Sequence, residues 1–434
     1  MIGLLNFVHL LFLILIAILV IKVKGHGGIV FLLVLFWFVV KVPFYFFDET
    51  FLPEELDPKI YNLENFVSLI VSKTFFIISA FMVYMIIARR YFVVAFDYVV
   101  PLPVILSSLV VFSLVFIGYF EMIGGLQNLW GNLISRGDII KGNAFFITIL
   151  WALATVVIIF SAKLNKLTQF FIVLFLAGCM YLAYGGRSLS VGLFVFWFMY
   201  LFFIDGKPPF KLFDVRLLPL YILGLCLFIL TPLLRQEDAM DIYMGSTEAF
   251  GLAIANNWQE IFQRLAVPQV ELLVIDYFTW DTIWAGTSWS DLAYLFCPVS
   301  MCVGKPPIDD GVYLYNIYLG TKIVPGMPVS DLIASSFPFE TWSIFYANFG
   351  FPGVVIGGLV YGAFLAVINN LCCSNRVFGR ICGSLIVGYV SINFFHFSNL
   401  YFGITLIPIL ICFFVLISVA SLNLINLHAR VPRA

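Results

Sequence analysis

Long runs of apolar residues constrain this chain more than any other feature of its sequence. The first run, residues 3–22, has no acidic residue, and its only lysine is its last residue. About 20 apolar residues are enough to cross a bilayer as a helix, and lipid satisfies no exposed backbone groups. We therefore predict eleven transmembrane helices, at residues 3–22, 28–47, 66–87, 98–118, 143–161, 168–184, 188–204, 216–234, 346–371, 380–396 and 403–423.

Composition excludes the main alternatives to a membrane protein. Only 11% of the 434 residues are charged, whereas soluble domains have about 25%. The net charge of −1 and the absence of a basic stripe argue against nucleic acid as a partner. The sequence predicts an all-α, polytopic membrane protein with about 11 transmembrane helices and one large extracytoplasmic loop.

Basic residues define the predicted orientation. Alternate connections and the C-terminal tail carry thirteen of the 23 lysines and arginines: Lys22, Lys24, Arg89, Arg90, Lys163, Lys166, Lys207, Lys211, Arg216, Arg376, Arg380, Arg430 and Arg433. Positive residues stay on the cytoplasmic side. We therefore expect the N-terminus outside, the C-terminus inside, and the acidic loop Asp48 to Glu64 outside.

The predicted topology divides the chain into three parts. Residues 1–234 hold eight spans, residues 235–345 form the large outer loop, and residues 346–434 hold three spans and a cytoplasmic tail. Loops of this length are usually functional. Within it, Trp258 to Phe278 has helical spacing interrupted by Pro268, which suggests short interfacial helices. Its tryptophans and tyrosines suit the headgroup level, and Gly304 to Pro328 should be irregular.

Gly185-Gly186-Arg187-Ser188 lies in a short outer turn that leads into a predicted helix. Glycines, free helix N–H groups and an arginine form a plausible phosphate site at the membrane surface. An ordinary turn with a lipid-facing arginine explains the motif slightly better on its own.

Three further cations could contribute to a phosphate site at the outer face. Arg235 ends the eighth predicted span and Arg264 lies on a predicted interfacial helix, while Lys305 stands between a glycine and two prolines. Anchoring at the interface explains Arg235 equally well, and a solvated surface explains Arg264 and Lys305.

Two residues could act as general bases. Glu340 precedes a span that opens with Asn348, Gly350 and Pro352, and His396 ends the tenth predicted span. A carboxylate or imidazole at the membrane edge can accept a proton. Glu340 could equally cap the helix or pair with a cation, and a structural role for His396 is favoured.

Few ionisable residues lie inside the predicted spans, apart from Lys41 and Lys73. This scarcity argues against a proton or ion relay. Cys297 and Cys302 lie in the outer loop, where a disulfide and two free thiols both remain open.

Three elements resemble the Wzy-type O-antigen polymerases, also called oligosaccharide repeat-unit polymerases. They are Gly185 to Ser188, the stretch from Pro298 to Pro306 around Lys305, and Glu340 with Asn348-Phe349-Gly350-Phe351-Pro352-Gly353. The order of the motifs and the late outer loop match as well. The resemblance covers most of residues 140–400. The arginine-and-glycine repeats of some members are not clearly present, which leaves Arg235 and Arg264 less certain.

The resemblance implies an activity at the periplasmic face of the bacterial inner membrane. Such enzymes transfer a glycan from undecaprenyl pyrophosphate to another lipid-linked repeat unit, with no nucleotide sugar, metal or other cofactor. Arg187, Arg235, Arg264 and Lys305 would bind the pyrophosphate, and Glu340 or His396 would be the base. Gly185, Gly186, Ser188, Asn348 and Gly350 would shape the site. A flippase and a chain-length regulator of the same pathway, together with membrane lipid, would be partners.

Three alternatives remain open. An O-antigen ligase favours a histidine late in the outer loop, but no histidine lies between His26 and His396. A multi-span glycosyltransferase could use Asp48 or Glu49 as its base. A flippase or exporter of lipid-linked glycan would need charges within the spans. The sugar, the linkage and the oligomeric state do not follow from the sequence.

Overall fold

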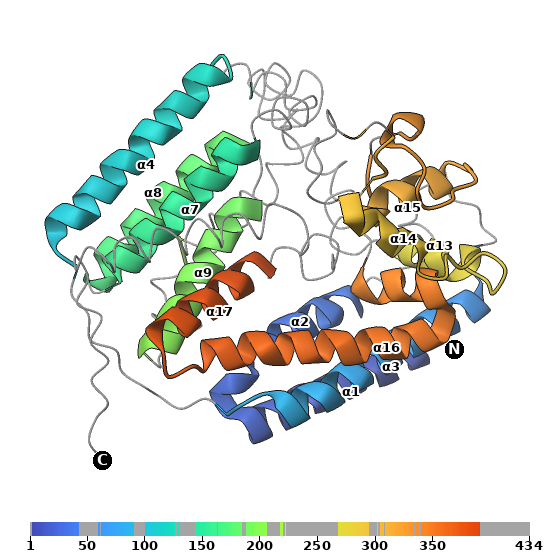
Figure 1. Cartoon of the computed structure of the whole chain (residues 1–434). Coiled ribbons are helices and arrows are strands. Elements are labelled where there is room, and N and C mark those ends of the chain that lie inside the picture. Colours follow the sequence, from blue (N-terminus) through green and yellow to red (C-terminus); the bar gives the residue numbers. More distant parts are fainter. Residues whose placement is uncertain are drawn as a thin grey trace, which may run out of the picture. The chain divides into compact units, whose positions relative to one another are not determined.

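A computed structural model of the chain describes residues 2–42, 60, 62–90, 100–125, 129, 144–162, 164–184, 188–205, 218–219, 222, 268–294, 302, 304–307, 309–333, 335–337 and 340–390. Every regular element in these ranges is a helix (Figure 1). The all-α prediction is therefore confirmed for the part of the chain that is described.

Five helices are long and apolar enough to cross a membrane: α1 (Ile2–Lys24), α3 (Leu63–Ile87), α4 (Leu102–Met122), α8 (Lys166–Tyr184) and α16 (Thr341–Cys372). Shorter apolar stretches lie in α2 (Ile29–Lys41), α7 (Ala144–Ser161), α9 (Ser188–Asp205) and α17 (Val377–Val390). These helices overlap nine of the predicted spans. The spans predicted at 216–234 and 403–423 lie outside the described residues, apart from residues 218, 219 and 222.

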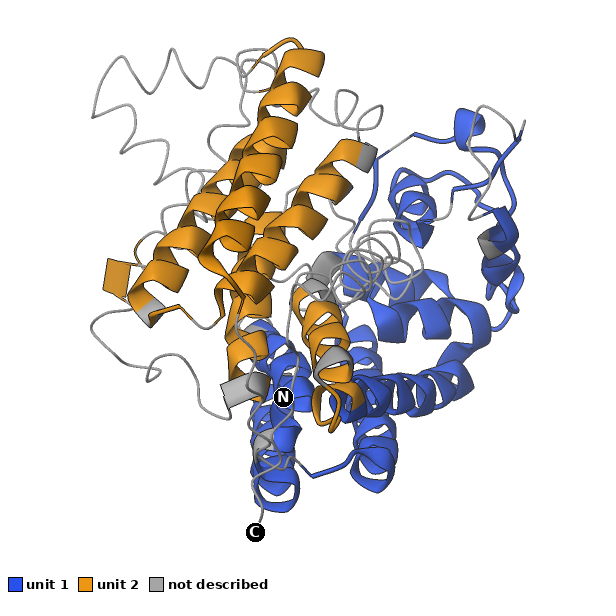
Figure 2. Ribbon diagram, turned by 60° about the vertical axis from the view of Figure 1, so that its left-hand side comes forward, with its two compact units in different colours: residues 1–91, 263–370, 393–403 blue, residues 92–262, 371–392, 404–434 orange. Residues whose placement is uncertain are grey.

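The helices belong to two compact units (Figure 2). Unit 1 comprises residues 1–91, 263–370 and 393–403, and unit 2 comprises residues 92–262, 371–392 and 404–434. Unit 1 thus combines the first three predicted spans with much of the predicted outer loop. The predicted division into three parts along the chain stays a prediction. It was defined by predicted membrane crossings, whereas the two units are defined by contacts between residues.

Helix directions in unit 1 agree with alternating membrane crossings. His9 of α1 hydrogen-bonds Thr74 of α3 at 2.9 Å, and near the other end of the same pair Arg90 donates to the Val23 carbonyl at 2.7 Å. The two helices are therefore parallel. If successive spans cross the membrane in opposite directions, the first and third spans run in the same direction.

Glycines bring α16 close to α3. A methyl group at Gly358 would meet the carbonyl of Phe76, and one at Gly362 would meet the carbonyl of Ala80. The two glycines are one helical turn apart, as are their partners, so α16 and α3 also run parallel. Small residues at this spacing allow close helix approach inside membranes.

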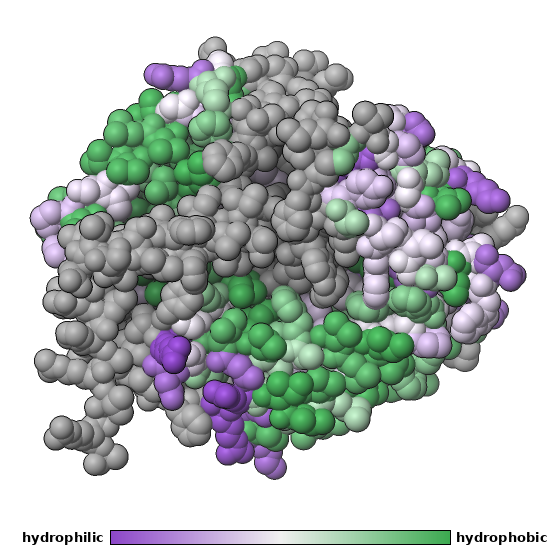
Figure 3. All heavy atoms as spheres, viewed as in Figure 1, coloured by the Kyte–Doolittle hydropathy of each residue, from purple (hydrophilic) through white to green (hydrophobic). Residues whose placement is uncertain are grey.

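The face of α1 that is not packed against other helices is apolar, as expected for contact with lipid. Its exposed large side chains recur every three or four residues: Leu4, Phe7, Val8, Leu11, Ile14, Leu15, Ile18 and Ile21. Such a stripe on a water-soluble protein would be an exposed apolar patch. Figure 3 shows apolar side chains covering the long helices of unit 1, with hydrophilic side chains gathered at one end of them.

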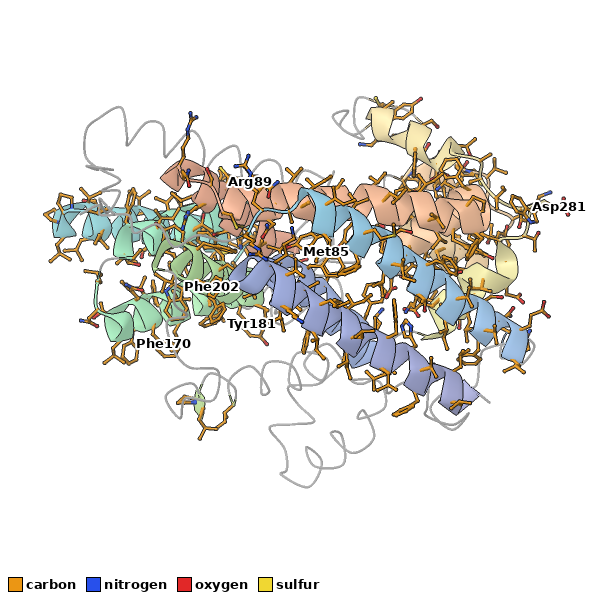
Figure 4. The ribbon with its side chains drawn as sticks, turned by 90° about the horizontal axis from the view of Figure 1, so that it is seen from below. Met85, Arg89, Phe170, Tyr181, Phe202 and Asp281 are labelled. Carbon is orange, nitrogen blue, oxygen red and sulfur yellow. The ribbon has the colours of Figure 1, made fainter. Side chains whose placement is uncertain are left out.

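Basic residues and asparagines join the ends of α1, α3 and α16. Asn369 donates to the carbonyl of Arg89 at 3.0 Å, and the Arg89 amide donates to Asn370 at 2.7 Å. Figure 4 shows Arg89 and the loop residue Asp281 at opposite ends of unit 1. Unit 1 therefore has one end rich in basic residues and another built from loop segments.

Unit 2 packs α4, α7, α8, α9 and α17 around an apolar core that includes Trp151, Phe196 and Tyr200. The buried Arg380 of α17 donates to the carbonyl of Phe203 in α9, while Gly388 lies against Phe196. These contacts make α9 and α17 antiparallel, as predicted for the seventh and tenth spans.

Gly350 reverses the chain near the start of α16. Its φ of 63° and ψ of −153° interrupt the helix, and this region of backbone space is essentially restricted to glycine. Methyl groups at Gly353 and Gly357 would both meet Phe345, so residues 341–349 fold back along the rest of α16 (Figure 1). The Asn348-Phe349-Gly350-Phe351-Pro352-Gly353 motif is thus a sharp turn between two helical segments.

Much of the predicted outer loop is compact. Its helices are α13 (Pro268–Tyr277), α14 (Thr287–Ser290) and α15 (Asp310–Tyr318). Trp284 and Tyr313 are 5% and 0% exposed and contact each other edge to face, so these two form a core rather than a headgroup belt. The expectation of irregular backbone over Gly304 to Pro328 is wrong at α15. There the Asp309 side chain caps the helix by accepting from the Gly311 amide.

Candidate functional site

Two lysines and two glutamates form a buried cluster in unit 1. Lys41 Nζ lies 3.0 Å from Glu271 Oε1 and also forms an ion pair with Glu340 Oε1. Lys73 Nζ lies 2.6 Å from Glu271 Oε2 and 3.7 Å from Glu340 Oε2. Each lysine therefore bridges both glutamates, and the four residues are between 2% and 8% exposed.

The cluster joins predicted spans to the predicted outer loop. Lys41 is the last residue of α2, and Lys73 lies near the middle of α3. Glu271 lies in the first turn of α13, and Glu340 immediately precedes α16. The cations thus come from helices that overlap predicted spans, and the carboxylates come from the segments that pack against these helices.

Two polar contacts align α13 with α3. Glu271 meets Lys73, while Asp276, five residues later, accepts a hydrogen bond from Asn65 at 3.1 Å. The helices are therefore antiparallel, and the N-terminus of α13 is level with the middle of α3. Lys73 is eight residues from Asn65, or roughly 12 Å along the helix. The cluster therefore lies well within the length of α3.

Both carboxylates stand at the N-terminal ends of helices. The positive end of a helix dipole stabilises negative charge placed there. The reversal at Gly350 is what brings the start of residues 341–349, and hence Glu340, alongside the later turns of α16. The two lysines and two glutamates balance in formal charge, which makes their burial possible.

Aromatic rings enclose the cluster. Trp342 Nε1 donates to Glu340 Oε2 at 2.5 Å, and Lys73 Nζ lies 5.8 Å from the Trp342 ring and 5.7 Å from the Phe38 ring. Cations favour the faces of such rings. Both oxygens of Glu340 are therefore engaged, so a further hydrogen-bond donor reaches this carboxylate only if one of its contacts opens.

A second set of polar groups organises the loop. Tyr313 donates to Asp291 Oδ2 at 2.7 Å and accepts from the Gly326 amide at 2.9 Å. Burial raises the pKa of Asp310 well above its ordinary value, and the neighbouring Asp309 and Asp291 add to this effect. The pKa values of Asp291 and Tyr313 also rise, chiefly through burial. This set is separate from the Lys41, Lys73, Glu271 and Glu340 cluster.

The structure describes the surroundings of three other sequence-predicted site residues. Asn348 donates to Ser288 Oγ at 3.0 Å and so ties α14 to the start of α16, while Gly350 makes the reversal. Lys305 lies on the loop, where its backbone pairs with Cys302 and Val329. Burial lowers the pKa of Lys305. Of the predicted site residues that the structure describes, only Glu340 belongs to the cluster.

Several predicted residues lie outside the described ranges. They are the cations Arg187, Arg235 and Arg264, the base candidates His396, Asp48 and Glu49, the glycines Gly185 and Gly186, and the side chain of Ser188. Their roles stay predictions. Cys302 is disulfide-bonded. Cys297, for which the sequence left a disulfide with Cys302 and two free thiols open, is also outside these ranges.

Lys41, Lys73 and Glu271 were not predicted as site residues. A sequence signal for the lysines existed, because an ionisable group within a span normally needs a partner of opposite charge. The sequence could not identify which acid would supply it, since Glu271 is 198 residues from Lys73. Glu271 lies on the stretch Trp258 to Phe278, which was predicted to form interfacial helices, and that position gave no indication of a buried partner.

No family model, curated protein or solved structure matches the chain. The resemblance to the repeat-unit polymerases therefore rests on the short motifs alone. What the structure adds is the conformation of one of those motifs and the surroundings of Glu340.

Proposed function

We propose that this protein polymerises lipid-linked oligosaccharide repeat units at the outer face of a bacterial inner membrane. The donor would be a glycan on undecaprenyl pyrophosphate, and the acceptor a sugar hydroxyl of a second lipid-linked unit. The product would be O-antigen or a similar surface polysaccharide. The protein would cross the membrane eleven times, with its N-terminus in the periplasm and its C-terminus in the cytoplasm.

The position of Glu340 carries the proposal. This carboxylate, singled out by the resemblance, lies beside two lysines at the junction of loop segments with membrane helices. Glycosyl transfer from a pyrophosphate needs a base for the acceptor hydroxyl and cations for the leaving group. The cluster places both kinds of group together within the apolar part of unit 1.

Other features support an outer-face site. Unit 1 has basic residues at the opposite end from loop residue Asp281, consistent with positive residues facing the cytoplasm (Figure 4). The disulfide at Cys302 suits an oxidising compartment, which the periplasm provides. Arg187, Arg235 and Arg264 remain proposed pyrophosphate ligands, with Lys305 as a further cation on the loop.

Deletion of the gene in its source strain tests the function. Electrophoresis of the surface polysaccharide should show capped single repeat units in place of a long-chain ladder, and the intact gene should restore the ladder. Free polymer that is not attached to lipid A core would instead indicate the ligase alternative. An unchanged ladder would eliminate both.

The buried charges also favour a second candidate, a flippase or exporter of lipid-linked glycan. Ionisable residues inside membrane segments commonly mark substrate or ion pathways, and the four-residue cluster is such a group. The same deletion separates the two candidates. Loss of transport would remove all surface units, whereas loss of polymerisation would leave single units on the core.

A further inference from the structure

We propose that Lys41 and Lys73 form the binding site for the pyrophosphate of the lipid-linked donor, and that Glu271 and Glu340 are counter-ions that the pyrophosphate replaces. The inference rests on the proposed function for the identity of the donor. It assigns binding to two lysines inside predicted spans rather than to the arginines of the outer turns.

Burial of four charged side chains is costly, because the penalty for removing them from water can exceed the attraction between them. Replacing a buried ion pair with well-packed apolar residues is often neutral or stabilising, and α2 and α3 are otherwise strongly apolar. Lys41 and Lys73 are 8% and 2% exposed. Retention of two lysines at this depth therefore points to a role beyond holding helices together.

The geometry of the lysines suits an anion with two linked groups. Glu271 already bridges them, with one oxygen 3.0 Å from Lys41 Nζ and the other 2.6 Å from Lys73 Nζ. Glu340 bridges the same pair from its own position. A pyrophosphate has two phosphoryl groups to replace two carboxylates, and its diester carries two negative charges, so the charge balance is kept.

The helix ends that hold the carboxylates add to the attraction. When Glu271 and Glu340 turn away, the N-termini of α13 and of residues 341–349 remain directed at the lysines. The N-terminal end of a helix carries a partial positive charge, which favours phosphate. The glutamates come from loop-derived segments, so the exchange requires only those segments or side chains to move.

The exchange links donor binding to the reaction. Pyrophosphate bound to Lys41 and Lys73 releases Glu340 from both lysines. Glu340 then accepts the proton of the acceptor hydroxyl, whose oxygen forms a bond to the anomeric carbon of the donor. The bond from that carbon to the pyrophosphate oxygen breaks, and its electron pair leaves with undecaprenyl pyrophosphate. The two lysines stabilise the charge that develops on this leaving group.

Binding of inorganic pyrophosphate to the purified full-length protein in nanodiscs tests the site. Pyrophosphate should raise the thermal unfolding temperature in a saturable manner, and sulfate at equal ionic strength should not. Absence of a saturable effect on the wild-type protein would overturn the proposal, whatever the polysaccharide ladder of the deletion strain shows.

Two charge-balanced changes then separate binding from structure. Lys73→Met with Glu271→Gln removes one charge of each sign, so the fold keeps its balance but should lose the pyrophosphate effect. The matched control, Asn65→Ala with Asp276→Ala, breaks the other polar contact between α3 and α13 and should keep the effect. If pyrophosphate raised the unfolding temperature of the Lys73→Met and Glu271→Gln double variant as much as that of the wild type, the assignment would be refuted.

A third variant tests the exchange from the opposite direction. Glu271→Gln with Glu340→Gln leaves both lysines in place without competing carboxylates. Its affinity for pyrophosphate should rise about tenfold or more, because the site no longer has to be vacated first. A purely structural cluster predicts no gain in affinity, and that result would also overturn the proposal.

Discussion

Lys73 Nζ and Glu271 Oε2 lie 2.6 Å apart inside unit 1, although 198 residues separate them in the chain. The contact fixes α13, part of the predicted outer loop, against the middle of a membrane helix. It therefore makes the loop an integral part of unit 1. The predictions below follow from this contact, from the reversal at Gly350 and from the carboxylates of the loop.

Removal of Lys73 alone should destabilise the protein strongly. Lys73→Met leaves two buried carboxylates with a single lysine, and breaking a buried pair typically costs about 3–5 kcal/mol. Lys73→Met with Glu271→Gln should recover most of that loss, since the charges again balance. Thermal unfolding of the purified variants measures both effects. Equal stability of the single and double variants would contradict the expected recovery.

The reversal in α16 should depend on Gly350. Gly350→Ala forces a side chain into a backbone conformation with φ of 63° and ψ of −153°, at a cost of about 1–3 kcal/mol. Gly118→Ala is the matched control, because Gly118 lies within α4 and has open space around it. Thermal unfolding should show a lower midpoint for Gly350→Ala only. An unchanged midpoint for Gly350→Ala would mean that the turn tolerates other conformations.

The length and apolar composition of the runs were sufficient to predict where the long apolar helices of the described part of the chain lie. Those signals are local, as the agreement of α1, α3 and α16 with predicted runs shows. The same signals could not predict the reversal at Gly350, because an apolar run containing glycine and proline also fits one kinked helix. They missed α15 as well, since its neighbours Pro306, Pro307 and Pro325 indicated turns.

The candidate site was harder to predict than the fold. Glu340 and Lys73 were both noticed, but their pairing depends on long-range packing that places residues 341–349 beside α3. Resemblance supplied Glu340 as a base without indicating that lysines hold it. Glu271 carried no sequence signal, because an acidic residue among Gln269, Val270 and Leu272 also fits a solvated helix.

Asp310 should make stability depend on pH. Its pKa rises in the folded state because the carboxyl is buried near Asp309 and Asp291. The protonated form is therefore favoured by folding, and this contribution is complete below the unfolded pKa and lost as pH rises towards the folded value. Asp310→Asn should thus be more stable than wild type at pH 7, by about 1 kcal/mol or more, and the advantage should vanish near pH 4.

Thermal unfolding of both proteins across this pH range measures the Asp310 effect. Asp281→Asn is the control, since Asp281 is exposed at the end of unit 1 (Figure 4), and it should leave the curve unchanged. An advantage of Asp310→Asn at pH 7 that persists at pH 4 would contradict the assignment of the effect to Asp310 ionisation.

Arg187→Ala should shorten the polysaccharide if this arginine contacts the pyrophosphate of the donor. The variant should insert normally in the membrane and give mainly single repeat units on a gel. Arg430→Ala, in the predicted cytoplasmic tail, removes the same charge and should give a normal ladder. A normal ladder from Arg187→Ala, at equal protein levels, would remove Arg187 from the site.

Glu340 and Glu271 offer a matched test of the general base. Both are buried and both pair with Lys41 and Lys73, so Glu340→Gln and Glu271→Gln cost the cluster the same charge. Only Glu340 is the proposed base, and its loss should lower the polymerisation rate by about 10²–10⁴-fold. Glu271→Gln should retain polymerisation within about tenfold of wild type. Equal loss in the two variants would assign both residues to structure, and His396→Ala would then be the next variant to measure.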